Sequence, residues 1–289
     1  MNREENKRLN RETKPHSIVT PPHWENSHGG NDEYIPVQIP NVPRSCRPPS
    51  LGWMEMRLDG SDMDCLWKYI ETAKKENVTI NNSANKRLAG NISSSLTLVD
   101  SDNFFRKVLD PLCAQYQLMF GDTPNIKATP SMHPLELVDM WVNFQKKHEF
   151  NPAHTHTGIF SFVIFMKIPT NYRDQKKLSI ANLSNSDAIS NFAFSYVDIF
   201  GNITHHPMIM SPEYEGIILL FPSSLPHQVY PFYESDETRI TISGNLGLNT
   251  KLIFDENSGL IKETSLLSEV NKKIDPTPSP QKRNLFSGL

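Results

Sequence analysis

From residue 135 onward, the chain is a succession of short runs rich in β-branched and aromatic residues, separated by clusters of turn-forming residues. No helical periodicity intervenes between the runs, a pattern typical of antiparallel sandwiches and barrels. We therefore predict that this part of the chain forms a β sandwich or barrel. The runs are LELVDMWVNFQ, GIFSFVIFMKIP, NFAFSYVDIF, THHPMIM, EGIILLFP, HQVYPFY and TRITISGNLGL.

A helix is predicted upstream of these strands, over residues 61–79. Its apolar residues recur at intervals of three and four, and Ser61 or Asp62 can cap its first turn. A helix that is apolar on one side needs a surface to pack against, and the later strands offer one.

A second helical region is predicted over residues 100–120, capped by Asp100 or Ser101. Pro111 lies inside it and is expected to bend or split it, because proline cannot donate the backbone hydrogen bond of a helix interior. With the helices first and the strands later, the pattern predicts a mainly β chain with flanking helices packed outside a double-sheet roll.

The two ends of the chain differ in composition from its middle. Residues 1–49 are polar and proline-rich and predict a disordered or loosely attached arm. Residues 50–252 form the predicted domain, with a helical part at 50–130 and a β-roll at 131–252. Residues 253–289 are predicted to be a C-terminal tail.

Composition excludes several classes of protein. The formal net charge is -3, from 29 Lys and Arg against 32 Asp and Glu, so general nucleic-acid binding is not expected. The three cysteines form no CxxC pair, which argues against a disulfide framework or a thiolate zinc site and fits a reducing cytosol. No secretory signal and no apolar run long enough for a membrane span are seen, so a cytoplasmic protein is expected.

Two histidines, His154 and His156, lie two residues apart just before a strongly predicted strand. In extended chain, side chains at this spacing share a face, with Cα atoms about 6.5–7 Å apart. Two imidazoles at that separation can converge on one metal ion. The pair alone leaves metal binding and a packing or surface role about equally open.

A third histidine strengthens the metal hypothesis. His227 follows the apolar strand of EGIILLFP and a Pro-Ser-Ser-Leu-Pro turn, and it begins another predicted strand. The turn is expected at the edge of a buried sheet, where a histidine would be displayed as a distant ligand. The alternative is a loop histidine that happens to follow a proline.

Arg239 begins an apolar strand twelve residues later, and Thr241 shares its face. A guanidinium that points into such a core needs an anion, and a guanidinium with a hydroxyl beside it suits one carboxylate. If residues 227–246 form a hairpin turning near Ser235, Arg239 lies roughly 13 Å along the roll from the level of His227. That gap suits a five-carbon dicarboxylate held by a metal at its other end; an edge arginine facing water is the alternative.

The segments HTHTG and SFVIF, EGIILLFPSSLPHQVYPF, RITISGN and, upstream, KRLAGNISSSLTLVD together resemble the 2-oxoglutarate/Fe(II) dioxygenases, of a type common in marine bacteriophage genomes. The resemblance covers roughly residues 50–250. It implies a double-stranded β-helix, a jelly-roll of the cupin-like kind. By position, His154 and His227 match the two ligand histidines and Arg239 the cosubstrate arginine. Thr241 stands where the wider superfamily often has a serine.

One position departs from the wider superfamily, whose first motif is His-x-Asp/Glu. Here its second member is His156, and because this branch uses His-x-His, we carry His156 over as the third ligand. Three neutral imidazoles leave the metal one positive charge higher than a carboxylate triad would, which favours an anionic oxoacid. Three histidines also suit zinc, so the resemblance implies the site more firmly than the metal.

The resemblance implies an oxidoreductase that couples oxidative decarboxylation of 2-oxoglutarate to hydroxylation of a substrate. Fe(II) and 2-oxoglutarate are the implied cofactors, with ascorbate an open addition, and O2 is the second small-molecule partner. The primary substrate is open; a prolyl or other amino-acid side chain is one candidate, by analogy only. If the gene is from a phage, the compartment is the host cytoplasm. Around the metal, a water-poor lining is expected from Phe160, Phe162, Ile164 and Phe221.

Two other functions stay open. A three-histidine zinc hydrolase explains the ligands but gives Arg239 and Thr241 no task. A non-catalytic jelly-roll module, structural or binding, would use the histidines for packing and hold no metal. Residues 170–191 form a long polar connection, which is either a solvated loop or a substrate lid.

Overall fold

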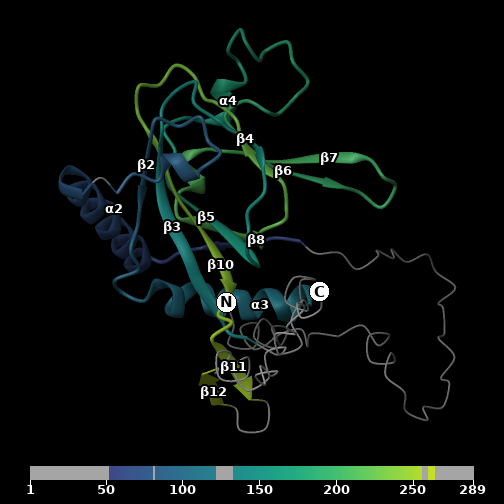
Figure 1. Cartoon of the computed structure of the whole chain (residues 1–289). Helices are drawn as coiled ribbons and strands as arrows, with labels where there is room; N and C mark the ends of the chain where they lie inside the picture. The colour runs from purple at the N-terminus through teal and green to yellow at the C-terminus, as the bar shows by residue number, and fades with distance from the viewer. Residues whose placement is uncertain (1–51, 81, 122–132, 256–259, 264–289) are drawn as a thin grey trace, which may run out of the picture. The chain divides into compact units, whose positions relative to one another are not determined.

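The computed structural model describes residues 52–80, 82–121, 133–255 and 260–263, all of which belong to the unit Pro49–Leu289 (Figure 1). The predicted N-terminal arm, residues 1–49, lies outside the described residues. No helix among those described is both long and apolar enough to cross a membrane.

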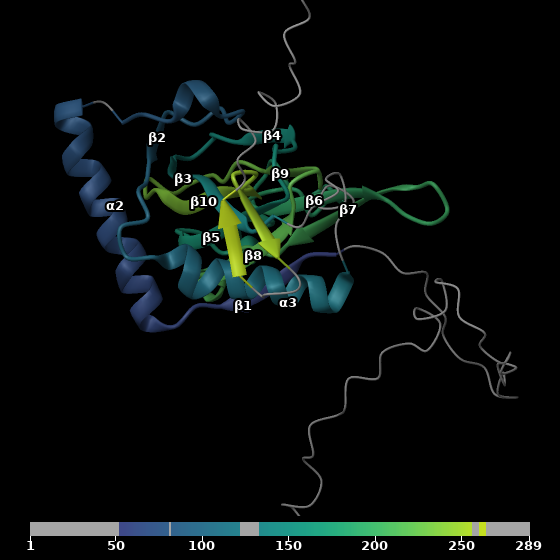
Figure 2. The ribbon, with the colours of Figure 1, turned by 60° about the horizontal axis from the view of Figure 1, so that its bottom comes forward.

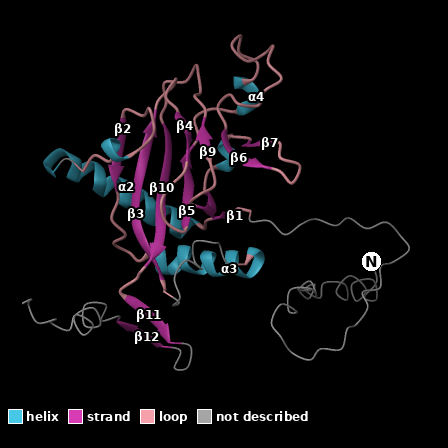
Figure 3. Ribbon diagram, turned by 45° about the vertical axis from the view of Figure 1, so that its right-hand side comes forward, coloured by secondary structure: helices cyan, strands magenta, loops and turns pink. Residues whose placement is uncertain are grey.

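Two antiparallel sheets form the framework of the described part of this unit (Figure 3). The large sheet has the strand order β1-β8-β5-β10-β3-β2, and the small sheet has the order β4-β9-β6-β7. The large sheet consists of β1 (Met54–Arg57), β2 (Ser94–Thr97), β3 (Leu135–Gln145), β5 (Phe160–Lys167), β8 (Ile217–Pro222) and β10 (Arg239–Leu248). The small sheet consists of β4 (Asn151–His154), β6 (Phe192–Val197), β7 (Ile203–Met208) and β9 (His227–Val229).

From β3 to β10 the chain passes repeatedly from one sheet to the other. It runs from β3 in the large sheet to β4 in the small one, back to β5, across to the β6–β7 hairpin, back to β8, across to β9 and back to β10. This connectivity is that of a jelly-roll in which two sheets face each other. The predicted fold class, a mainly β double-stranded β-helix with flanking helices, is confirmed.

The large sheet is buried on both of its faces. One cluster of apolar side chains, among them Val163 and Phe165 of β5, packs with side chains of β6 and therefore fills the space between the sheets. A second cluster, to which Phe160 and Ile164 of β5 belong, packs against the helices. Strand β5 is thus apolar at nearly every position because its two faces lie in two different cores.

The first helix, α2 (Gly60–Ile80), confirms the prediction for residues 61–79 and buries Leu66 and Ile70 against the large sheet (Figure 2). Its predicted cap was wrong. The carboxylate of Asp59 accepts from the backbone N–H of Asp62 at 2.8 Å, so the cap stands two residues before Ser61.

The second helical region begins with a π-helical stretch, η3 (Phe105–Leu109), and continues as α3 (Asp110–Phe120). The Asp100 carboxylate accepts from the backbone N–H groups of Phe104 and Phe105, which makes Asp100 the cap, one of the two predicted candidates. The change of helix type falls directly before Pro111, as expected for a residue that cannot continue the hydrogen-bond ladder.

Several elements depart from the sequence predictions. The predicted helical part, residues 50–130, also contains β1 and β2, which form the two edges of the large sheet. The predicted hairpin between His227 and Arg239 was wrong, because β9 lies in the small sheet and β10 in the large one, so the connection crosses between sheets. The predicted tail, residues 253–289, begins within a two-stranded sheet of β11 (Leu252–Asp255) and β12 (Leu260–Glu263).

Three short helical turns complete the described elements. They are η2 (Asn85–Arg87), α4 (Tyr172–Gln175) and η5 (Pro212–Tyr214). Of these, α4 lies inside the long connection predicted over residues 170–191, between β5 and β6.

Candidate metal centre

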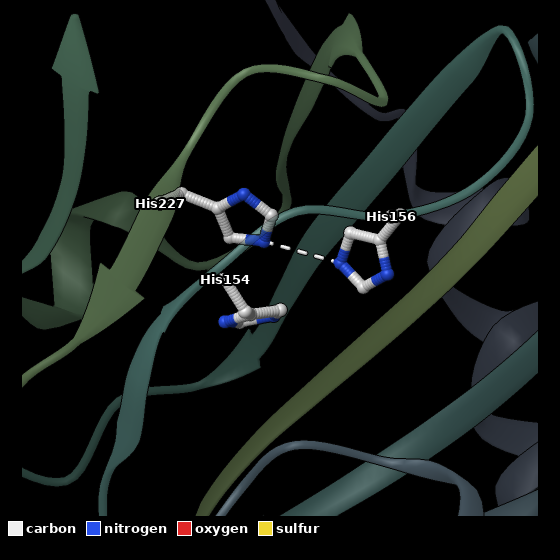
Figure 4. A group of neighbouring side chains, drawn as sticks. All are labelled: His154, His156 and His227. Carbon is white, nitrogen blue, oxygen red and sulfur yellow. Dashed lines mark hydrogen bonds between the residues drawn. The ribbon is translucent and has the colours of Figure 1, made fainter.

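Three histidines meet at one end of the small sheet (Figure 4). His154 ends β4, His227 begins β9, and these two residues are directly paired across the antiparallel ladder. His156 follows two residues after His154, in the connection to β5. One ring nitrogen from each histidine lies within 4.8 Å of those of the other two. Strand register therefore brings together the three residues that sequence spacing had singled out.

Backbone carbonyls orient two of the rings. Nδ1 of His154 lies 2.7 Å from the carbonyl oxygen of Pro152, and Nδ1 of His227 lies 3.0 Å from that of Leu225. Because a carbonyl oxygen only accepts, each Nδ1 must carry the proton and donate it. In the neutral rings the lone pair is then on Nε2, the atom through which such histidines bind metals, and that of His227 lies within hydrogen-bond distance of Nε2 of His156.

The spacing of two of the rings fits a single ion. Nε2 of His156 and Nε2 of His227 lie 3.2 Å apart (Figure 4). Two nitrogens each about 2.1 Å from one ion are about 3.0 Å apart at a right angle and about 3.4 Å apart at a tetrahedral angle. The observed separation therefore suits two ligands in neighbouring positions on one metal.

The surroundings keep these imidazoles neutral. Burial, with a smaller contribution from neighbouring His154, lowers the pKa of His227 to about 3 and that of His156 to about 4. The ring of His227 lies 4.9 Å from that of Phe221 and 5.5 Å from that of Phe192, centroid to centroid. Neutral rings in an apolar enclosure are ready to bind a cation without first losing protons.

The apolar lining was predicted only in part. Phe221 lies beside His227, as expected. Phe160 and Ile164 instead pack in the core on the helix side, and Phe162 belongs to that same core while also reaching the cavity next to the histidines. The prediction was wrong for Phe160 and Ile164 because side chains alternate along β5, so the interior receives the odd-numbered residues, Val163 and Phe165.

A cavity of about 150 Å³ adjoins the three histidines. Its walls come from β3, β5 and β10 of the large sheet, from the small sheet and from residues 87–92. Two cationic side chains, Arg87 and Arg239, line it, and no Asp or Glu does so among the described residues. The cavity is therefore suited to an anion.

Arg239 is buried at one end of this cavity, with 1% of its surface exposed. Its Nη2 donates to the carbonyl oxygen and the hydroxyl of Ser190 at 2.7 and 2.9 Å, and its Nη1 lies 3.4 Å from Oε1 of Gln145. The guanidinium also lies 5.0 Å from the ring centroid of Phe232. All of these partners are neutral.

The charge of Arg239 is consequently incompletely satisfied. Its Nε is buried and has no hydrogen-bond partner among the described residues. Burial lowers the pKa of the guanidinium to about 10, which still leaves it protonated at neutral pH. A buried cation with a free N–H beside a cavity is the arrangement that a carboxylate would complete.

The register of β3 with β10 arranges further polar side chains on the same wall. Arg239 is paired with Gln145, Thr241 with Asn143, and Ser243 with Trp141, and all six line the cavity. Thr241 thus shares the face of Arg239, as its spacing predicted.

Sequence reasoning missed the three cavity residues of β3, namely Trp141, Asn143 and Gln145. A signal was present: in WVNFQ, polar Asn and Gln alternate with apolar residues inside a strand that is buried along this stretch. Ser190 was also missed, and nothing in its local sequence marks it. Two further histidines, His205 and His206, are exposed on β7 and lie outside the cluster of three.

Comparison with known proteins bears on this site. Residues 139–245 match the profile of a protein family described as "Putative 2OG-Fe(II) oxygenase". The matched segment contains all three histidines as well as Arg239 and Thr241. Among curated proteins, no sequence match was found.

Solved structures provide further similarities. A prolyl-4-hydroxylase from Pseudomonas putida is 11% identical, with 69% of this chain and 94% of that chain covered and a TM-score of 0.42. The viral collagen prolyl hydroxylase of Paramecium Bursaria Chlorella virus-1, in complex with 2OG, is 9% identical, with 67% and 94% covered and a TM-score of 0.38. A Trichoplax adhaerens prolyl hydroxylase, in complex with a hypoxia inducible factor peptide, is 13% identical, with 68% and 83% covered and a TM-score of 0.40.

Proposed function

We propose that the protein is a non-haem iron dioxygenase, because residues 139–245 match the profile of the family described as "Putative 2OG-Fe(II) oxygenase", in keeping with the resemblance of their motifs. In this proposal it couples the oxidative decarboxylation of 2-oxoglutarate to the hydroxylation of a second substrate. His154, His156 and His227 bind the metal, and Arg239 with Thr241 binds the far carboxylate of 2-oxoglutarate.

The observation that carries the proposal is the joint presence of two incomplete sites at one cavity. Three imidazoles, each with a ring nitrogen within 4.8 Å of those of the other two, lie at the cavity, and a buried guanidinium whose Nε has no partner among the described residues also lines it. A metal ion would complete the first site and a carboxylate the second. A dicarboxylate that also binds the metal completes both, and 2-oxoglutarate is such a molecule.

The donor set fits the proposed metal. Fe(II) accepts imidazole nitrogens, and three ligands leave open positions for a chelating oxoacid and for O2. Because His156 replaces the usual carboxylate, the protein contributes no negative charge to the metal. The resulting higher positive charge favours an anionic cosubstrate, in keeping with the absence of Asp and Glu among the described residues of the cavity wall.

In this proposal, residues of the protein bind the metal and the cosubstrate, hold the ligand rings in orientation and keep water away. The carbonyls of Pro152 and Leu225 fix the His154 and His227 rings, and Phe192 and Phe221 exclude water from the same region. When bound, iron and 2-oxoglutarate would supply an oxidant made from O2 that hydroxylates a C–H bond, with succinate and CO2 as coproducts. The protein contributes geometry and electrostatics to that chemistry.

For the primary substrate, we propose a prolyl or other amino-acid side chain as the first candidate. Pockets that enclose whole drug-sized ligands typically measure about 300–1,000 Å³. The cavity of about 150 Å³ is much smaller, and the cosubstrate occupies part of it. A substrate that inserts one small group and stays outside with the rest fits this space better than a bulky metabolite.

The test is an anaerobic titration of the Fe(II)-loaded protein with 2-oxoglutarate, followed by visible absorption. We expect the weak charge-transfer band of a chelated oxoacid, and we expect His154→Ala and His227→Ala to abolish it. His205→Ala, which removes an exposed imidazole from β7, serves as the matched control and should keep the band. A wild-type protein that loads iron but never develops the band would contradict the proposal.

A three-histidine zinc hydrolase is the second candidate, because the same donor set suits Zn²⁺. It provides no use for the buried charge of Arg239. Succinate release that requires iron, O2 and 2-oxoglutarate together would exclude it.

The same assay, run with and without ascorbate, tests whether that reductant is needed. A non-catalytic module, the third reading, predicts a gently purified protein that carries no metal.

A further inference from the structure

We propose that Ser190 is a positioning residue that holds the guanidinium of Arg239 in the orientation needed to receive the far carboxylate of the cosubstrate. This inference rests on the proposed function and adds to it a residue outside the strands of the roll. It also gives a task to part of the long connection between β5 and β6.

Ser190 provides two acceptors for one nitrogen of the guanidinium. Its carbonyl oxygen and its hydroxyl oxygen both accept from the same nitrogen, Nη2, at 2.7 and 2.9 Å. With Nη2 held in this way, Nε remains without a partner among the described residues. Ser190 therefore holds the arginine head through Nη2, while the N–H of Nε stays unused.

The backbone conformation of Ser190 makes this double contact possible. Its φ is 63°, in the left-handed region that residues other than glycine, asparagine and aspartate rarely adopt. Ser190 is fully buried, and its N–H donates to the carbonyl of Pro231 at 3.0 Å. Ser190 thus keeps a strained backbone conformation, and two of its oxygens accept hydrogen bonds from one cation. Strain of this kind is typical of residues that are constrained by function.

A second hydroxyl sets the direction of the Ser190 hydroxyl. Oγ1 of Thr170 lies 3.2 Å from Oγ of Ser190, and both side chains are buried. If Ser190 donates its proton to Thr170, its oxygen keeps its lone pairs for the N–H of Arg239. Thr170 and Ser190 stand at the two ends of the connection that passes through α4, so both ends of this connection contribute to the arrangement.

Two hydrogen bonds between Gln175 and Tyr233 hold the same connection at a second point. The side chain of Gln175, which is buried, donates to the carbonyl of Tyr233 at 2.9 Å and accepts from its N–H at 2.7 Å. Residues 170–191 were predicted to be either a solvated loop or a lid. The end of the connection that contains Ser190 and contacts Arg239 is held in place by buried hydrogen bonds. A positioning role requires such a fixed structure.

The inference makes a selective prediction about ligands. Under the proposed function, the three histidines would hold the metal that binds the oxoacid end of the ligand, and only a dicarboxylate would also pair with Arg239. A variant in which the guanidinium of Arg239 is less well held should therefore bind 2-oxoglutarate more weakly. Its binding of 2-oxobutyrate, which lacks the far carboxylate, should not change. General damage to the fold would weaken the binding of both oxoacids.

The experiment is calorimetric titration of the full-length, Fe(II)-loaded protein with each oxoacid under anaerobic conditions. Ser190→Ala removes the hydroxyl, and Ser190→Gly removes it while relieving the left-handed strain, so at least one variant should fold. We expect both to raise the Kd for 2-oxoglutarate by about tenfold, the effect of one hydrogen bond to a charged group. The Kd for 2-oxobutyrate should change less than about twofold. Ser184→Gly, in the same connection and without contact to Arg239, should change neither.

Three outcomes would overturn the inference. An unchanged Kd for 2-oxoglutarate in both Ser190 variants shows that the hydroxyl does not matter. Equal weakening of both oxoacids shows that the effect is structural. If Arg239→Ala also leaves 2-oxoglutarate binding unchanged, the arginine assignment in the proposed function fails, which is distinguishable because it does not depend on Ser190.

Discussion

Arg239 keeps a positive charge in a place where each partner it contacts is neutral. Ser190 and Gln145 supply oxygen acceptors and Phe232 supplies a ring face, but no carboxylate pairs with it among the described residues. A buried charge without a counter-ion costs several kcal/mol of stability. Such a cost is expected at a residue whose task is to bind an anion that arrives from outside.

This leads to a prediction in which ligand binding is lost while the stability of the fold is largely kept. Arg239→Met keeps much of the side-chain volume and removes the buried charge, so we expect the free energy of unfolding to fall by less than about 1 kcal/mol or to rise. We expect the same variant to lose roughly 2–5 kcal/mol of 2-oxoglutarate binding, because the far carboxylate is left unpaired. Urea unfolding and calorimetric titration measure the two quantities. A strongly destabilised variant would show that Arg239 is chiefly structural.

The half-buried His156 and the buried His227 predict how the metal-free protein responds to acid. Their pKa values, about 4 for His156 and about 3 for His227, lie below the ordinary value of 6.5. Between these values the unfolded chain binds protons that the folded chain does not, so stability is full above pH 6.5 and declines as the pH falls. From pH 7.5 to 5 we expect a loss of roughly 2–4 kcal/mol in urea unfolding.

A matched variant tests the origin of that pH dependence. His227→Gln cannot titrate in this range, so its free energy of unfolding should fall less steeply with acid than that of the wild-type protein. His206→Gln, which removes an exposed imidazole from β7, should leave the slope as it is. Identical slopes in all three proteins would assign the acid sensitivity to other groups.

At the level of residues, the sequence was most informative where a chemical type and a spacing coincide. His154 and His156 share a spacing that suits one ion, and Arg239 is conspicuous as a cation at the start of an apolar strand. Ser190 and Gln145 could not be identified in this way, because they contact Arg239 from 49 and 94 residues away. Contacts across such separations depend on strand register, which a single sequence does not determine.

At the level of elements, the long runs were predicted well and several of the short strands were not. Strands β3, β5, β8 and β10 coincide with runs of apolar and β-branched residues. Strands β1, β2 and β4 have four residues each and were missed, since such a short strand carries too little periodicity. The crossing from β9 to β10 resembles a hairpin in sequence, and only the pairing of each strand with other partners shows otherwise.

One element offers a sharp test of local structure. The Asp100 carboxylate caps the helical region that leads into α3 and also accepts from the hydroxyl of Tyr69 on α2 at 2.9 Å. We expect Asp100→Ala to lower the free energy of unfolding by about 1–3 kcal/mol, because two backbone N–H groups and a hydroxyl lose their acceptor. Ser101→Ala, at the other predicted cap position, should have an effect within about 0.5 kcal/mol. Equal effects would contradict the assignment of Asp100 as the cap.

At the level of the whole unit, the candidate site exists only when both sheets are in place. His154 and His227 come from the small sheet, whereas Arg239 and Thr241 come from the large one. Each crossing between the sheets therefore helps to build the site, and no single segment of the chain contains it. A ligand that joins the metal to Arg239 would bridge the two sheets and should stabilise the folded state as a whole.

Metal binding should therefore be measurable as stability of the entire unit. At a free metal concentration about one hundred times Kd, binding adds about 2.7 kcal/mol to the free energy of unfolding. For a folded unit of this size, that corresponds to a rise in Tm of roughly 5–10 °C. We expect Zn²⁺ in air, or Fe(II) under anaerobic conditions, to produce this rise in a thermal melt and a chelator to reverse it. His227→Ala should abolish the rise and His205→Ala should preserve it. A Tm that does not respond to either metal in the wild-type protein would mean that the three imidazoles pack together without binding an ion, whatever their geometry suggests.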